Sequence, residues 1–135
     1  MAIVNEIFRV ENDNTISFGN HESAAKLKID FEHNGNAYYV KTYKEATRVE
    51  LNGNLLFETV PGSTIHNFYF HDDMLEFEGE GAGNTQFTIT LEPNTTYNIT
   101  ADGTIVGTAK SNMAGKINFG KELTSDPFHF AVTKA

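Results

Sequence analysis

Histidine is the residue type in this sequence that most directly suggests metal binding, and the chain contains five of them. His66 and His71 lie five residues apart, and Asp72 and Asp73 follow at once. Metal-binding pairs on helices place two histidines, or a glutamate and a histidine, three or four residues apart on one face. No such pair occurs on a helix here, so we expect structural or surface histidines and no tightly bound metal or cofactor. Only a convergence of His66, His71 and His129 in the folded chain would revive a metal site.

A run of acidic residues offers a second kind of metal chemistry, since Ca²⁺ is bound through carboxylate and carbonyl oxygens. The run comprises Asp72, Asp73, Glu76, Glu78 and Glu80. It lacks the Asp-x-Asp-x-Asp-Gly spacing of a calcium-binding loop. Glu76 and Glu78 also alternate with apolar neighbours, which is the pattern of the solvent side of a strand. The sequence therefore predicts a solvated acidic face.

Catalytic residues are not indicated by any motif in the chain. There is no Gly-x-Ser-x-Gly nucleophile elbow, and the glycine-rich stretch 79–83 lacks the Lys-Ser/Thr ending of a phosphate-binding loop. No Asp or Glu lies on an otherwise apolar strand face, where burial would raise its pKa toward that of a general acid. We therefore expect a protein that is not an enzyme.

Three tyrosines are candidates for binding by stacking. Tyr39 and Tyr69 are expected opposite the core faces of their strands, and Tyr97 is assigned the same orientation. A tyrosine on a sheet face can stack on a sugar ring or anchor a protein partner. The alternative is ordinary packing between neighbouring strands.

The two ends of the chain are candidates for association with another subunit. The segment 1–8 is apolar and favours β structure, with one charge and no proline, so it would be a poorly protected sheet edge. The expected strand over 128–132 is the second candidate for pairing with another subunit. The expected contact residues are Ile3, Val4, Ile7, Phe8, Phe128 and Phe130. The competing interpretation is that the first segment completes the domain's own sheet.

These candidate residues must be positioned by strands, because short alternating runs separated by turn residues recur along the whole chain. Leu27, Ile29 and Phe31 alternate with charged residues, as in a half-buried strand. Asn34-Gly35, Asn52-Gly53 and Asp102-Gly103 are strong signals for tight hairpins, which need positive φ. We expect a loop over 79–84 and at most one helical turn, over 22–26. The expected strands cover residues 27–31, 37–43, 49–51, 55–60, 64–70, 74–78, 85–91, 96–100, 104–109, 116–119 and 128–132.

This spacing predicts an all-β fold, a single-domain β-sandwich or jelly-roll of about ten short antiparallel strands. The domain spans 1–135, with 1–8 as an N-terminal arm and 124–135 as an added terminal strand. We expect the core to contain Leu27, Ile29, Phe31, Phe68, Phe70, Leu75, Phe77, Phe87, Ile89, Leu91, Ile117 and Phe119.

The composition excludes several classes of partner and of site. The formal net charge is −8, which opposes binding to nucleic acid or anionic lipid. There is no cysteine, which excludes disulfides, thiolate metal sites and a cysteine nucleophile. No apolar stretch approaches the length of a membrane span, so we expect no membrane insertion. The first eight residues do not resemble a signal peptide, so we expect a cytoplasmic protein or export by a route other than Sec.

Between Phe8 and about Leu123 the sequence resembles small uncharacterised all-β proteins of clostridial Firmicutes, some of which are labelled endosialidase. The matching residues are Ile16-Ser17-Phe18-Gly19-Asn20, Val40-Lys41-Thr42, Val60-Pro61-Gly62-Ser63, His66-Asn67-Phe68, Leu91-Glu92-Pro93, Asp102-Gly103, Val106-Gly107 and Gly115-Lys116-Ile117-Asn118-Phe119. The stretch from Tyr97 to Phe119 is also similar to β-sandwich accessory modules of polysaccharide-degrading enzymes. These resemblances imply a β-sandwich. A sialidase would need a longer propeller, Ser-x-Asp boxes and more than the two arginines present here.

Three functions remain open. The first is a non-catalytic structural subunit that assembles with itself through sheet edges or terminal strands. The second is a small carbohydrate-binding or accessory module that uses Tyr39, Tyr69 or Tyr97. The third is a component of a glycan-degrading enzyme.

Overall fold

The computed structural model describes residues 3–71 and 73–135, which fold into antiparallel strands without any helix. The all-β prediction is confirmed, although β1 and β2, of three residues each, were not expected. Among the described residues nothing forms a helix with the length and hydropathy of a transmembrane segment. The thirteen strands are β1 (Phe8–Val10), β2 (Ile16–Phe18), β3 (Leu27–His33), β4 (Asn36–Tyr43), β5 (Ala46–Leu51), β6 (Asn54–Val60), β7 (Ser63–His71), β8 (Met74–Gly81), β9 (Gly83–Thr90), β10 (Thr96–Ala101), β11 (Thr104–Lys110), β12 (Lys116–Leu123) and β13 (Phe128–Lys134).

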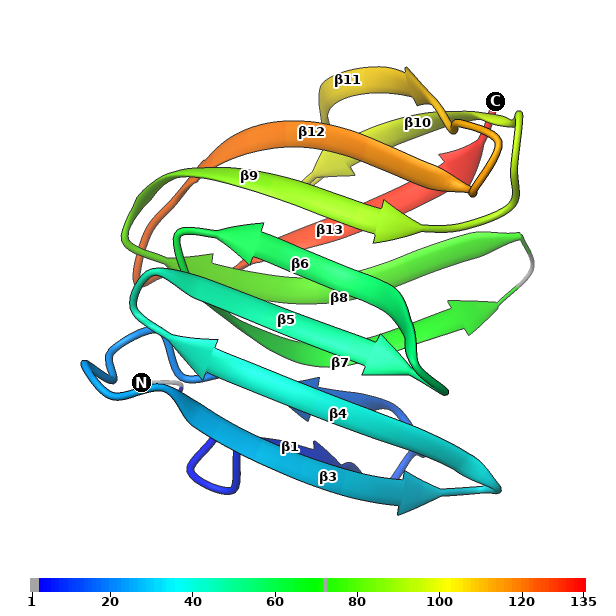
Figure 1. Cartoon of the computed structure of the whole chain (residues 1–135). Helices are drawn as coiled ribbons and strands as arrows, with labels where there is room; N and C mark the ends of the chain where they lie inside the picture. Colours follow the sequence, from blue (N-terminus) through cyan, green and yellow to red (C-terminus); the bar gives the residue numbers. More distant parts are fainter. Residues whose placement is uncertain (1–2, 72) are drawn as a thin grey trace.

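The strands form two sheets that face each other as a sandwich (Figure 1). One sheet has seven strands in the order β1-β2-β7-β8-β13-β10-β11, and we call it sheet A. The other has six strands in the order β12-β9-β6-β5-β4-β3, and we call it sheet B. After the meander β3 to β6, the chain crosses repeatedly between the sheets. The edge strands are therefore β1 and β11 in sheet A, and β12 and β3 in sheet B.

The three predicted hairpins form, and their glycines show why the turns are tight. Gly35, Gly53 and Gly103 have φ of 79°, 84° and 80°. The Asn or Asp before each glycine also has positive φ, so two successive residues adopt the left-handed conformation that this kind of turn needs. The prediction of positive φ at all three glycines is confirmed.

The glycine-rich stretch 79–84 is not the loop that the sequence predicted. β8 continues to Gly81 and β9 starts at Gly83, so only Ala82 connects them. A Cβ on Gly79 would lie 3.2 Å from Ile65 Cδ1, and one on Gly81 would lie 3.1 Å from Leu123 Cδ1. The glycines therefore allow close packing within strands. The helical turn expected over 22–26 does not form either.

Phenylalanines fill the space between the sheets. Phe57, on β6, makes edge-to-face contacts with Phe18, Phe68, Phe77 and Phe87, at ring-centroid distances of 5.3 to 6.0 Å. Such contacts add to the free energy gained by burying the rings. Seven of the predicted core residues are buried: Phe68, Leu75, Phe77, Phe87, Ile89, Ile117 and Phe119.

The other predicted core residues show where the sandwich ends. Leu27, Ile29 and Phe31 are only half-buried, because β3 is an edge strand, and Leu91 is half-buried just beyond the end of β9. Phe70 is 52% exposed, so its assignment to the core was wrong.

The described segments near the two termini both contact the rest of the domain. β13 lies between β8 and β10, and Phe130 is fully buried. Val4 donates a backbone hydrogen bond to Gly19 (3.0 Å), and Phe8 packs against Phe31 with a centroid distance of 4.8 Å. β13 therefore has no free backbone edge, whereas β1, which contains Phe8, is an edge strand of sheet A. The contact of these residues with another subunit stays a prediction.

Candidate functional site

The strand ends at one end of the sandwich surround two cavities that lie between the sheets. The turns after β3, β5, β7 and β9 gather there, at the right of Figure 1. The first cavity has a volume of about 390 Å³ and the second about 310 Å³. Phe70 lines both of them. We call the two cavities together the end groove.

Phe70 is held in this position by the pattern of β7. Its ring meets that of Phe68 edge to face at 5.7 Å, so both rings lie on the inner side of sheet A. Phe68 is covered by the opposite sheet, whereas Phe70 lies one step nearer the turn, where the sandwich is open. The result is an aromatic ring that is anchored on one side and half exposed on the other.

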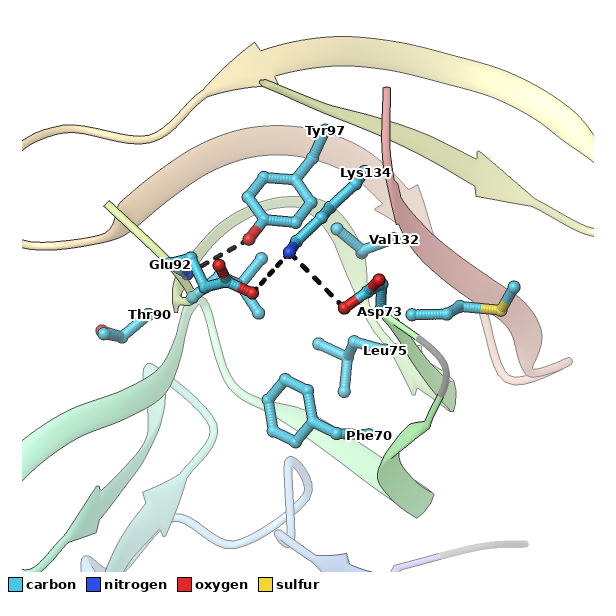
Figure 2. A pocket seen from close by; sticks show the side chains of 10 residues that line it. Phe70, Asp73, Leu75, Thr90, Glu92, Tyr97, Val132 and Lys134 are labelled. Atoms are coloured by element: carbon cyan, nitrogen blue, oxygen red, sulfur yellow. Dashed lines mark hydrogen bonds and ion pairs between the residues drawn. The ribbon is translucent and has the colours of Figure 1, made fainter. Parts of the chain in front are cut away.

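Charged groups form the rim of the first cavity (Figure 2). Lys134 Nζ lies 2.7 Å from Glu92 Oε2 and 3.4 Å from Asp73 Oδ1. The hydrogen bond to Glu92 and the charge of Asp73 raise the pKa of Lys134, so its ammonium stays charged. One cation between two carboxylates leaves a net charge of −1 and several oxygens that accept hydrogen bonds.

The wall of the first cavity combines apolar and polar atoms. Leu75 and Val132 form its apolar side together with Phe70 (Figure 2). The Tyr97 hydroxyl accepts a hydrogen bond of 3.1 Å from the Glu92 backbone N–H. Thr90 Oγ1 is buried and has no hydrogen-bond partner among the described residues. This hydroxyl is a polar group whose hydrogen bond the protein itself leaves unmade.

The second cavity has an apolar floor and a rim of uncharged polar groups. Ile16, Leu51 and Leu56 lie along its floor. Its polar lining residues come from the connection between β1 and β2 and from the hairpin formed by β3 and β4: Asn14, His33, Asn34, Asn36 and Tyr38. Amide groups both donate and accept hydrogen bonds, so this rim suits a ligand rich in hydroxyl groups.

The three tyrosines predicted to stack on a ligand are placed differently from one another. Tyr69 is exposed, lines the second cavity and stacks on His71 at 4.6 Å. Tyr39 is half-buried on sheet B, paired with Asp30 and Glu50, and lines neither cavity. Tyr97 is only 3% exposed, so its ring points into the core and cannot serve as a stacking platform.

Two of the histidines converge on one glutamate on the outer face of sheet A. Glu76 contacts His71 through Oε2 and His129 Nε2 through Oε1, the latter at 2.7 Å. The hydrogen bond from His71, together with that from His129, lowers the pKa of Glu76. Outside the undescribed Asp72, no group of three His, Cys, Asp or Glu side chains is arranged to hold a metal ion.

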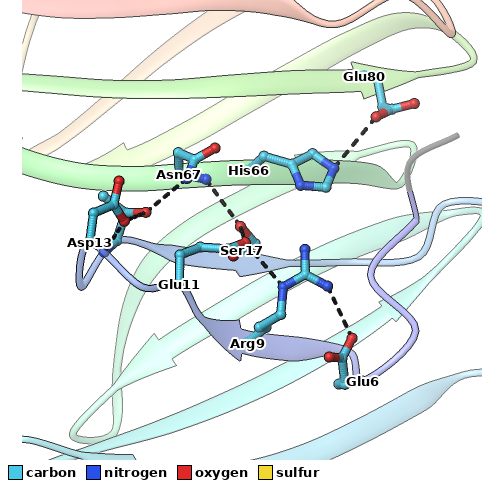
Figure 3. Close-up of polar contacts among 9 residues, drawn as sticks. Glu6, Arg9, Glu11, Asp13, Ser17, His66, Asn67 and Glu80 are labelled. Carbon is cyan, nitrogen blue, oxygen red and sulfur yellow. Dashed lines mark hydrogen bonds and ion pairs between the residues drawn. The ribbon is translucent and has the colours of Figure 1, made fainter.

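His66 belongs to a separate polar cluster, which includes a buried acid (Figure 3). Its Nε2 lies 3.7 Å from Glu80 Oε1, and Glu80 is only 1% exposed. Burial raises the pKa of Glu80, and its Oε1 has no hydrogen-bond partner within 3–71 and 73–135. The sequence analysis included Glu80 in the acidic run and predicted a solvated face, which is wrong for this residue: it was placed in a loop, whereas it lies buried on β8.

A β-bulge organises the remainder of this cluster. The register between β7 and β8 shifts at Asn67, which has a φ of 55°. Asn67 donates hydrogen bonds to Ser17 Oγ (3.1 Å) and Thr15 Oγ1 (2.9 Å), which join β7 to β2 (Figure 3). Ser17 in turn donates to Glu11, and this hydrogen bond lowers the pKa of Glu11. The cluster therefore stabilises the junction of strands, and neither of the two cavities opens onto it.

Comparison with protein-family models, with curated proteins and with solved structures found no match to this chain.

The sequence analysis assigned Phe70 to the core and did not single out Glu92 and Lys134, which form the charged rim of the first cavity. A weak signal existed for Phe70, because it directly precedes the turn 71–73 and so had to lie near the end of its strand. No signal pointed to Glu92 and Lys134, which are 42 residues apart (134 − 92) and meet only in the fold.

Proposed function

We propose that this protein binds a saccharide chain in the end groove and does not alter it chemically. The observation that carries the proposal is the half-exposed Phe70 at the junction of two cavities. The apolar face of a sugar ring packs well on an aromatic side chain, and its hydroxyls need hydrogen-bond partners around that contact. The amides of the second cavity and the carboxylates of the first supply such partners.

The arrangement of the acidic groups supports binding without catalysis. Hydrolysis of a glycosidic bond generally requires one carboxyl group held protonated and a second carboxylate across the bond. Both carboxylates of the first cavity, Asp73 and Glu92, instead contact the same ammonium of Lys134. An ion pair of this kind holds both carboxylates beside one ammonium and orients their oxygens for hydrogen bonding.

The test is to screen neutral and acidic oligosaccharides on an array and to measure the strongest binder by calorimetry. Phe70→Ala should weaken binding at least about tenfold, equivalent to about 1.4 kcal/mol. Tyr39→Ala is the matched control, since it removes an aromatic ring that lines neither cavity. Equal affinities of the two variants, or no binding to any saccharide, would contradict the proposal. Cleavage of the bound oligosaccharide would contradict its non-catalytic part.

A further inference from the structure

The four edge strands of the sandwich differ in how well they are protected from pairing with another chain. Natural sheet edges are blunted by short length, charges, prolines or bulges. β1 has only three residues, and Arg9 on it is paired with Glu6 and Glu11. β3 presents alternating charges on its outer side. β12 carries two lysines and a glutamate.

β11 lacks most of these protective features. Its sequence, TIVGTAK, has no acidic residue and no proline, and its single charge is at the last position. Ile105 is 77% exposed and points away from the core, opposite Thr100 of β10. A bulge leaves Val106 without a partner, but Gly107–Lys110 pairs regularly with β10 and has no strand of its own sheet on the other side.

β11 carries no acidic residue, so the repulsion between two copies is weaker at this edge than over the acidic parts of the surface. The chain carries a net charge of −8, so copies repel each other over most of their surface. Residues 103–121, which contain β11, have three lysines and no Asp or Glu. Antiparallel pairing of β11 with itself would set each Lys110 near the Thr104 end of the other strand, so the two lysines would lie far apart.

We propose that two copies of this chain associate through β11, forming one continuous antiparallel sheet across a twofold axis. The contact is the same on both copies, so it closes as a dimer and does not propagate into a fibre. It satisfies the free backbone groups of β11 and covers Ile105. This proposal is independent of saccharide binding, because the end groove lies at the strand ends and β11 lies along the side of the sandwich (Figure 1).

Sedimentation velocity from about 1 µM to about 1 mM tests the proposal, together with hydrogen exchange at both ends of this range. We expect a concentration-dependent dimer in which the amides of β11 exchange more slowly at high concentration. Ile105→Lys should raise the dissociation constant at least about tenfold. Val60→Lys is the matched control, because Val60 is also an exposed aliphatic residue (53% exposed) but lies on an inner strand of sheet B.

A monomer over the whole concentration range would overturn the proposal. So would a dimer that Ile105→Lys leaves intact, or one in which β11 gains no protection from exchange. Phe70→Ala should dimerise as the natural sequence does, so a loss of saccharide binding and a loss of the dimer can be told apart.

Discussion

At the scale of single residues, Glu80 shows the sharpest conflict between burial and charge. Its carboxyl group is almost completely buried, and the imidazole Nε2 of His66 lies 3.7 Å from Oε1, beyond hydrogen-bond distance. Desolvation raises its pKa above the ordinary value of 4.5. The folded protein therefore retains a proton on Glu80 at pH values where the unfolded chain has already lost it, and stability falls as the pH rises through this window.

We expect Glu80→Gln to stabilise the protein at neutral pH by about 1 kcal/mol, because an amide carries no charge to desolvate. The gain should shrink as the pH falls and disappear well below 4.5, where the wild-type carboxyl is protonated in both the folded and the unfolded state. Thermal unfolding at several pH values measures this. Glu78 lies two residues before Glu80 on β8 and is exposed, so Glu78→Gln should show no comparable gain. A destabilised Glu80→Gln variant at neutral pH would contradict the argument.

Glu76 has the opposite pH dependence. Its pKa is lowered by the hydrogen bonds from His71 and His129, so its contribution to stability is present above the unfolded value of 4.5 and is lost as the pH falls through the lowered value. Because the cluster is partly exposed, Glu76→Gln should cost less than about 1 kcal/mol at neutral pH. Urea denaturation should show that the difference from wild type disappears in acid. Glu32→Gln, exposed on β3, serves as the control.

At the scale of the elements, the hairpin turns determine which strands pair and in which register. Gly53 joins β5 to β6 with a φ of 84°, and a Cβ there would meet open space, so only the backbone conformation opposes a side chain. The same two-residue device joins β3 to β4 and β10 to β11. These turns place alternate residues of each strand toward the core.

We expect Gly53→Val to destabilise the protein by about 1–2 kcal/mol, the cost of the left-handed conformation for a residue with a Cβ. Chemical denaturation at a concentration too low for association measures the change. Gly107→Val is the control, since Gly107 also has open space around its Cβ position but does not have positive φ. An equal loss in both variants would show that backbone conformation is not the cause.

At the scale of the whole molecule, a cluster of buried phenylalanines packs the two sheets together, and one further phenylalanine, Phe70, lies half exposed at the open end of the sandwich. Phe57 is fully buried among four aromatic rings. Phe70, in contrast, has a ring contact with Phe68 of this cluster and is half exposed to solvent. The same side chain should therefore contribute to stability in one place and to binding in the other.

Phe57→Ala should reduce the free energy of unfolding by about 3–5 kcal/mol, because it leaves a cavity between the sheets. Phe70→Ala should reduce it by much less, since half of that ring is already in water. Parallel denaturation curves of the two variants provide the measurement. If Phe70→Ala were as damaging as Phe57→Ala, the ring would be a core residue, and the saccharide test would need a milder variant such as Phe70→Leu.

The sequence alone was enough to predict the all-β class, the hairpins at Gly35, Gly53 and Gly103, and four of the buried phenylalanines, which are Phe68, Phe77, Phe87 and Phe119. These features are local, because a period of two residues and an Asn-Gly or Asp-Gly pair reflect the geometry of a strand and of a tight turn. The position of a residue along its own strand was therefore predictable. Its position relative to the other sheet was not.

Only the tertiary structure decided which residues meet and which remain open. The alternation placed Phe70 with Phe68, but the sandwich ends between them, so one ring is covered and the other lines the end groove. Glu92, just beyond β9 of sheet B, meets Lys134 on β13 of sheet A, and Glu76 meets His129 through the pairing of β8 with β13. The C-terminal strand became interior because β13 is inserted between β8 and β10, whereas β1 and β11 became the edges of sheet A. Strand order sets these outcomes, and it depends on long-range packing of two sheets, which local periodicity does not encode.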